Sequence, residues 1–167
     1  ASPGYYRVDL DRDGIRTELT ATTRTGFVRL TYPATDLARV LVQTGLSATG
    51  AFDGSLEIVA PDRIRGTFTA GGFSNADSRF QMHFVIAFDR PFTGFGTWLG
   101  GELTADSTTA TGTRAGGYVT FDTSSNPVVQ MKLGVSFVSV ANAEANLDAE
   151  NPDWDFDAVR AAAASQW

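Results

Sequence analysis

The sequence predicts a mainly β protein, an antiparallel β-sandwich followed by a helical tail at the C-terminus. Apolar residues recur at every second position through most of the chain, which is the period of a half-buried strand. Glycine and proline interrupt this pattern at short intervals, as they do at turns. Few helical patterns lie between these runs. The crossover helices that a parallel sheet needs are therefore not expected.

The expected strands follow one another with short turns. They are residues 5–10, 15–22, 26–32, 38–43, 55–59, 63–69, 79–89, 92–98, 116–121 and 128–139. One face of the strand at 79–89 is strongly apolar and is expected in the core; it comprises Phe80, Met82, Phe84, Ile86 and Phe88. The opposite face is only half polar, which predicts that it is partly covered too. Residues 100–117 are small, polar and aperiodic, and they predict a long loop.

The character of the chain changes after its last expected strand. Residues 141–150 favour a helix, and residues 153–167 predict a second one that Asp153 or Asp155 can cap. This second helix carries an apolar stripe that needs a surface to pack on; the stripe comprises Phe156, Val159, Ala163 and Trp167. We therefore expect a β-sandwich over residues 1–139 and a helical segment over residues 140–167.

Composition excludes several classes of function. The 167 residues carry a net charge of −6 and a pI near 4.6, which argues against binding to nucleic acid or to an anionic membrane surface. The absence of cysteine excludes thiolate metal sites and thiol nucleophiles. His83 is the only histidine, so a serine triad is excluded. We expect His83 to be a hydrogen-bonded residue in the wall of the sandwich.

The stretch DLDRDG, residues 9–14, is the strongest metal-binding pattern. Asp9, Asp11, Asp13 and Gly14 match the first half of an EF-hand calcium loop. The position that needs a bidentate glutamate holds Thr20, and both flanks are strands rather than helices. The sequence therefore favours a hairpin turn with Gly14 in the left-handed conformation, and calcium binding is the less favoured alternative.

Candidate residues for sugar chemistry are few. The carboxylates show no spacing that pairs two of them for glycosidase catalysis. The aromatic stretch at 88–98 could offer Phe95 and Trp98 as flat faces to a sugar, although both could equally be core residues.

Four blocks of the sequence resemble one family. They are SPGYYRVDL (2–10), GIRTELTATTRTGFVRLTYP (14–33), FDRPFTGFGTW (88–98) and KLGVSFVSVANAEANLDAENPDWDFDAVRAAAASQW (132–167). In order and spacing they resemble the N-terminal β-domain of glycoside hydrolase family 92. The resemblance covers essentially the whole chain, and it is looser from about residue 36 to 78.

This resemblance implies an extracellular or periplasmic, calcium-dependent, inverting exo-α-mannosidase that acts on mannose-containing glycans. In that family a sandwich is linked by helices to an (α/α)6 barrel, which carries the acid, the base and the calcium ligands. The chain begins at Ala-Ser-Pro without a methionine, so it is expected to be part of a longer protein. No catalytic or metal-binding residue is then expected in it. Its partner is the catalytic barrel, and the apolar stripe of the second helix would lie against either the sandwich or that barrel.

Two alternatives remain open at this stage. In one, the chain is an autonomous carbohydrate-binding module in which Phe95 and Trp98 form the platform. In the other, it is a structural domain that contacts other proteins through the helix stripe.

Overall fold

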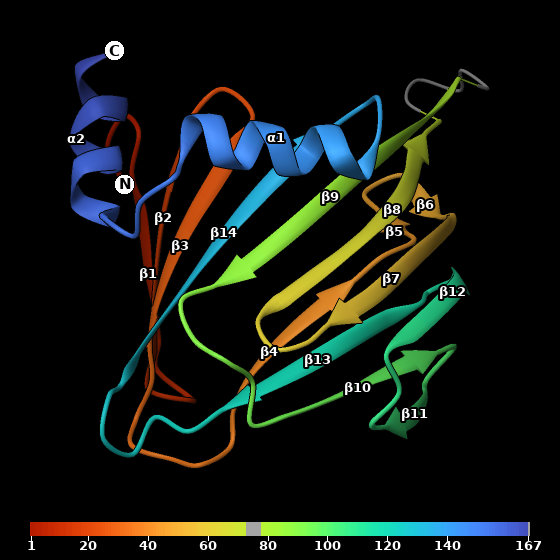
Figure 1. Ribbon diagram of the computed structural model, residues 1–167, viewed down its shortest axis with the longest axis horizontal. Helices are drawn as coiled ribbons and strands as arrows, with labels where there is room; N and C mark the ends of the chain where they lie inside the picture. The colour runs from red at the N-terminus through yellow and green to blue at the C-terminus, as the bar shows by residue number, and fades with distance from the viewer. Residues whose placement is uncertain (73–77, 167) are drawn as a thin grey trace.

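The computed structural model describes residues 1–72 and 78–166, and it is a sandwich of two antiparallel sheets with two helices on one outer face (Figure 1). The strands are β1 (Tyr6–Leu10), β2 (Ile15–Ala21), β3 (Thr25–Thr31), β4 (Ala38–Gln43), β5 (Leu46–Ser47), β6 (Gly50–Ala51), β7 (Asp53–Val59), β8 (Arg63–Gly71), β9 (Arg79–Phe88), β10 (Gly94–Leu99), β11 (Glu102–Ala105), β12 (Thr109–Thr113), β13 (Gly116–Phe121) and β14 (Val128–Ser136). The helices are α1 (Val140–Glu150) and α2 (Phe156–Ser165). The predicted fold class is confirmed.

The two sheets are unequal. The larger has eight strands in the order β1-β2-β3-β14-β9-β8-β7-β12, and the smaller has four in the order β11-β10-β13-β4. Strands β5 and β6 form a separate two-stranded ribbon. The sheets approach each other at one side, where β12 contacts both β10 and β13.

The core lies between the two sheets and follows the alternation of the strands. Its largest fully buried side chains in this layer are Phe88, Phe121, Leu56, Ile64, Val119 and Val129. On β9 the prediction is confirmed for Phe84, Ile86 and Phe88, and Met82 is half-buried. It is wrong for Phe80, which lies at the start of the strand, packs against Phe137 outside the core and stays 40% exposed.

Helix α1 covers the outer face of the large sheet, as the half-polar face of β9 predicted. Ser139 caps the helix, since its Oγ accepts a hydrogen bond from the backbone of Asn142 at 3.0 Å. Ala143 and Leu147 pack on the outward side chains of β9, chiefly Val85. The helix lies so close to β14 that a Cβ on Gly134 would be 2.4 Å from the carbonyl oxygen of Ala143.

The stretch at residues 9–14 is the predicted hairpin turn. Strands β1 and β2 pair on either side of it, and Gly14 adopts a φ of +65°. Its backbone N–H donates to the carbonyl of Leu10 at 2.8 Å and closes the turn.

The loop predicted at 100–117 is wrong, because this segment contains β11 and β12. Gly100 and Gly101, both with positive φ, turn the chain so that β11 pairs with β10. Strand β12 then crosses to the other sheet and pairs with β7. Short strands of threonine and small residues show no side-chain period, and the backbone hydrogen bonds that hold them leave no pattern in the sequence.

Candidate functional site

The aromatic residues predicted for sugar binding lie on opposite faces of β10. Phe95 points inward and packs against the core, together with Phe92. Trp98 is three positions away, so the alternation of the strand places it on the outer face of the small sheet. The two residues therefore cannot form one platform, and only Trp98 is placed to meet a ligand.

The Trp98 ring rests on a glycine of the neighbouring strand. Trp98 pairs with Gly116 of β13, and Tyr118 pairs in the same way with Gly96 of β10. A Cβ on Gly116 would lie 2.1 Å from Cζ2 of Trp98, and one on Gly96 would lie 2.7 Å from the ring and hydroxyl of Tyr118. Both rings therefore need a glycine beneath them, and they lie flat on the sheet.

These rings form a shallow pocket on the outer face of the small sheet, which we call the aromatic shelf. Its volume is about 250 Å³, and its lining is Trp98, Tyr118, Leu41, Leu103 and Arg39. Flat aromatic faces beside one guanidinium group suit the apolar face and hydroxyls of a sugar ring. Sequence reasoning missed Tyr118, Leu41 and Leu103, because only the cross-strand register brings them beside Trp98.

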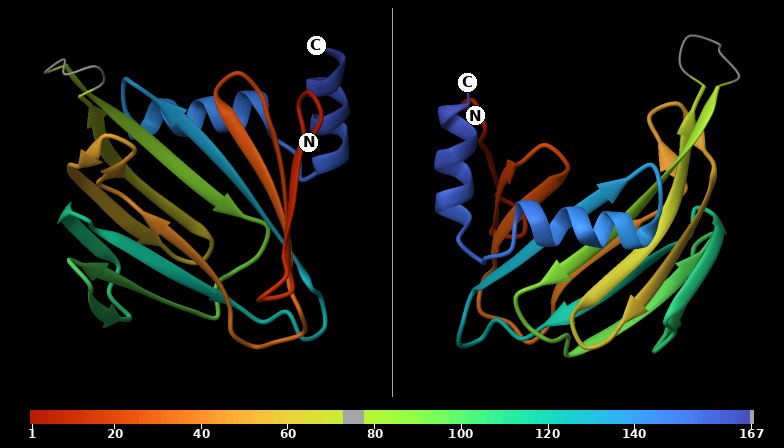
Figure 2. Two further views of the ribbon diagram at one scale, coloured as in Figure 1. Left: turned by 180° about the vertical axis from the view of Figure 1, so that it is seen from behind. Right: turned by 45° about the horizontal axis from the view of Figure 1, so that its top comes forward.

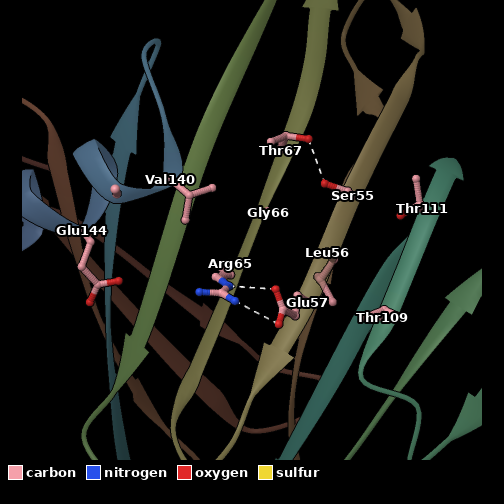
Figure 3. A pocket seen from close by; sticks show the side chains of 11 residues that line it. Ser55, Leu56, Glu57, Arg65, Gly66, Thr67, Thr109, Thr111, Val140 and Glu144 are labelled. Atoms are coloured by element: carbon pink, nitrogen blue, oxygen red, sulfur yellow. Dashed lines mark hydrogen bonds and ion pairs between the residues drawn. The ribbon is translucent and has the colours of Figure 1, made fainter.

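A larger pocket lies elsewhere, on the outer face of the large sheet beside the start of α1 (Figure 3). It measures about 650 Å³ and is lined by Ser55, Leu56, Glu57, Arg65, Gly66, Thr67, Thr109, Thr111, Val140, Ala141 and Glu144. Its polar side chains mostly satisfy one another. Arg65 donates to both carboxylate oxygens of Glu57, at 2.8 and 3.0 Å, and the Ser55 and Thr67 hydroxyls are 2.9 Å apart.

Both carboxylates of this pocket are paired with arginines. Hydrogen bonds from Arg65 hold the pKa of Glu57 below its usual range, although burial opposes the shift. Glu144 forms an ion pair with Arg63 at 2.7 Å. A catalytic acid needs a raised pKa, and Glu57 has a lowered one.

Other carboxylates are held by arginines in the same way. Arg29 donates to both oxygens of Glu18 and, with Tyr5, lowers the pKa of that carboxyl group against the effect of burial. Burial also opposes the shift at Glu150, yet hydrogen bonds from Thr22 and Arg24 lower its pKa.

The acidic turn at residues 9–14 is arranged for ion pairs. Asp9 accepts hydrogen bonds from Arg7 at 2.7 Å and from Arg16 at 2.8 Å. In the described part of the chain, no group of three or more His, Cys, Asp or Glu side chains is placed to hold a metal ion.

His83 differs from its prediction as a hydrogen-bonded wall residue. It lies half-buried on the outer face of β9, between Thr67 and Ser136, and its Nδ1 is buried without a hydrogen-bond partner. Both neighbouring hydroxyls are engaged elsewhere, that of Thr67 with Ser55 and that of Ser136 with Asn142.

The apolar stripe of α2 packs on the sandwich of this chain. Phe156 is 2% exposed, stacks edge-on against Phe27 and lies under the guanidinium group of Arg29. Val159 and Ala163 are half-buried, and Ala163 lies against Gly4 near the N-terminus. Phe156 therefore has no surface left for another domain. Trp167, the last predicted member of the stripe, lies outside the described residues.

Neither helix of the described chain is long and apolar enough to cross a membrane. Of the two, only α1 contributes residues to the lining of the pocket in Figure 3.

Comparison with known proteins points to one family. Residues 1–136 match the glycosyl hydrolase family 92 N-terminal domain. No curated protein matches the chain.

Solved structures of that family share the fold. An inverting family 92 mannosidase from Bacteroides thetaiotaomicron superimposes with a TM-score of 0.85 at 25% identity, and an α-mannosidase from the same organism does so with a TM-score of 0.86 at 24% identity. Both cover 100% of this chain. A family 92 glycosyl hydrolase named ccman5 covers 92% of it at 26% identity, with a TM-score of 0.82. The chain spans 22%, 23% and 20% of these proteins, respectively.

Proposed function

Because the chain belongs to the N-terminal domain of glycosyl hydrolase family 92, we propose that it is the non-catalytic domain of a secreted α-mannosidase. It serves as a scaffold and as one wall of the sugar site. The catalytic acid and base, and the calcium, belong to a separate catalytic domain. The substrates are glycans with terminal α-linked mannose.

One observation carries the non-catalytic part of this proposal. Arginine side chains hold Asp9, Glu18, Glu57 and Glu150, and the pKa of each of these carboxyl groups is lowered. An inverting glycosidase needs one carboxyl group that stays protonated and a second that activates water across the bond, roughly 6.5–9.5 Å away. A domain whose carboxylates are tied to arginines can support a sugar site and leave the proton transfers to another domain.

An activity assay tests this proposal. The purified chain is incubated with α-linked mannobiose, with and without added calcium, and released mannose is measured. We expect no turnover above the blank, because the proposal puts the catalytic acid and base in the separate catalytic domain. A polypeptide extended by the neighbouring coding sequence is expected to release mannose. Turnover by the 167-residue chain would contradict the proposal.

A second candidate function is an autonomous carbohydrate-binding module, and the aromatic shelf favours it. Two rings that lie flat on glycines present the kind of surface on which sugars stack. If this function is correct, calorimetric titration with mannobiose gives saturable binding that Trp98→Ala abolishes. Trp154→Ala is the matched control, since it removes a tryptophan that is 37% exposed next to α2. If titration of the wild-type chain gives no heat, the binding-module function is excluded and only the scaffold function remains.

A further inference from the structure

The sandwich is closed along one side and open along the other. At the closed side β12 of the large sheet contacts β10 and β13 of the small one. At the other side the small sheet ends at β4, whereas the large sheet continues to β2 and β1. The left view of Figure 2 shows β1 and β2 to one side of β4, away from the small sheet.

Three of the inward side chains of β1 and β2 are apolar and exposed. Tyr6 pairs with Leu19, which in turn pairs with the core residue Val28, so this row continues the core outward. Tyr6 is 51% exposed, Leu19 36% and Leu10 43%. A sheet face that is apolar on the core side is normally covered by a second layer.

The outer edge of β4 has backbone groups that are not used in pairing. The backbone N–H of Thr44 donates to the carbonyl of Ala115 at 2.8 Å, so it points toward β13. Along an antiparallel strand, successive residues direct their N–H and C=O groups alternately to one side and the other. The N–H groups of Leu41 and Gln43 therefore point away from β13, and within the described residues β4 has no strand on that side. The carbonyl of Arg39, on the same edge, accepts a hydrogen bond from Tyr32 at 2.8 Å, which places this edge beside the end of β3.

We infer that the free edge of β4 receives further β-strands, which continue the small sheet across the inner face of β2 and β1. The strands come from the part of a family 92 enzyme that this chain does not span, so the inference rests on the proposed function. An open strand edge is a template for another strand. Strands are spaced about 4.8 Å apart, so roughly one added strand covers each uncovered strand of the large sheet. Their inward apolar residues bury Tyr6, Leu10 and Leu19.

The length of the relatives supports this occupant over a second copy of the chain. The chain corresponds to 22% and 23% of the two mannosidases from B. thetaiotaomicron. A family 92 enzyme therefore has ample polypeptide to supply two strands from its own sequence. A strand from the same polypeptide also has a much higher effective concentration than one from a separate molecule.

Hydrogen exchange of individual amides tests the inference. The 167-residue chain is compared with the longer polypeptide from its own coding sequence. We expect the amides of Leu41 and Gln43 to exchange at least about 100-fold more slowly in the longer protein, because they become hydrogen-bonded in a sheet.

The opposite edge of the same sheet provides the matched control. The N–H of Asp106 donates to Phe95 at 3.1 Å, so the amides of Leu103 and Ala105 in β11 point outward as those of Leu41 and Gln43 do. Leu41 and Leu103 are also equally exposed, at 67% and 65%. The β11 amides are expected to exchange at the same rate in both proteins.

Proline variants provide a second measurement, since proline removes one N–H and is tolerated at a strand edge. Leu41→Pro and Leu103→Pro are expected to shift the melting temperature of the 167-residue chain equally. In the longer protein, Leu41→Pro is expected to lower the melting temperature more than Leu103→Pro does.

The outcomes separate the two proposals. If the longer protein releases mannose but Leu41 and Gln43 exchange as fast as Leu103 and Ala105, the inference is wrong and the proposed function stands. If the longer protein protects these amides but has no mannosidase activity, the inference stands and the proposed function fails. If the coding sequence contains no further polypeptide and the chain forms a dimer that Leu41→Pro disrupts, the occupant is a second copy and the inference is wrong.

Discussion

Arg29 joins three elements through a single side chain. It lies on β3, donates to Glu18 of β2 at 2.8 and 2.9 Å, and donates to Asp157 of α2 at 2.9 Å. Its guanidinium group also lies 4.3 Å from the ring centre of Phe156. Glu18 is buried, so loss of its arginine would leave a carboxylate in the protein without a charged partner.

This contact predicts how stability responds to acid. Hydrogen bonds from Arg29 hold the pKa of Glu18 below its usual range, and burial opposes them. Such a group stabilises the fold above its unfolded pKa of about 4.3, and the stabilisation is lost as pH falls through the lower folded value. We therefore expect the melting temperature to fall steeply below about pH 4. Glu18→Gln should be less stable at neutral pH and show a shallower acid decline.

Glu57→Gln is the control for this prediction. Arg65 lowers the pKa of Glu57 as well, but both side chains are nearly half exposed and water screens the pair. Circular dichroism melts of the three proteins between about pH 7 and pH 3 give the comparison. Identical acid declines for the wild type and Glu18→Gln would contradict the role given to Glu18.

At the scale of the element, α2 is held by one large anchor. Asp155 caps the helix, its side chain accepting from the backbone of Ala158 at 3.0 Å, and Phe156 follows directly and fills the space over β3. The remaining contacts are smaller or more exposed. They are Val159, Ala163 against Gly4, the ion pair of Asp157 with Arg29, and Arg160 over the ring of Tyr5. The docking of α2 therefore depends mainly on its first turn.

Phe156→Ala is expected to release α2 from the sandwich. Truncation of a fully buried phenylalanine costs about 3–5 kcal/mol. This loss exceeds the stabilisation that the other contacts of this short helix provide. Hydrogen exchange should show loss of protection in residues 156–165, with β9 and β14 still protected. Val159→Ala, at a half-buried position of the same helix, is the control and should cost only about 1 kcal/mol. Equal protection of α2 in both variants would contradict the anchor role.

The elements could be predicted from sequence wherever side chains alternate or a cap is present. Strand β9 and both helices have such signals, and they form where expected, with Asp155 rather than Asp153 as the cap. Strands β11 and β12 could not be predicted, because Thr104, Thr109 and Thr111 lie in strands that backbone pairing alone defines. The composition of the aromatic shelf could not be predicted for the same reason. Trp98 could be singled out as an aromatic residue, but its neighbour Tyr118 is twenty positions away and meets it only through the register of β10 and β13.

At the scale of the whole molecule, the sandwich class followed from the sequence but the division into sheets did not. Alternation shows which side chains face inward, whereas it does not show which strands are neighbours. Thus Val129 and Phe88 could both be assigned to a core, yet the position of β14 in the centre of the large sheet could not be foreseen. The open edge of β4 could not be foreseen either, since it depends on the same strand order.

The central position of β14 has a consequence for how the protein is made. The last strand of this chain in sequence order lies between β3 and β9, and it hydrogen-bonds to both. Until residues 128–136 leave the ribosome, strands β1–β3 and strands β7–β9 form two separate antiparallel units. Each unit has an open edge at the position that β14 will occupy. At a translation rate of about 5–20 residues per second, β3 waits several seconds for its partner. The large sheet is thus completed only after residues 128–136 have emerged, and the exposed edges of β3 and β9 are natural targets for chaperones in that interval.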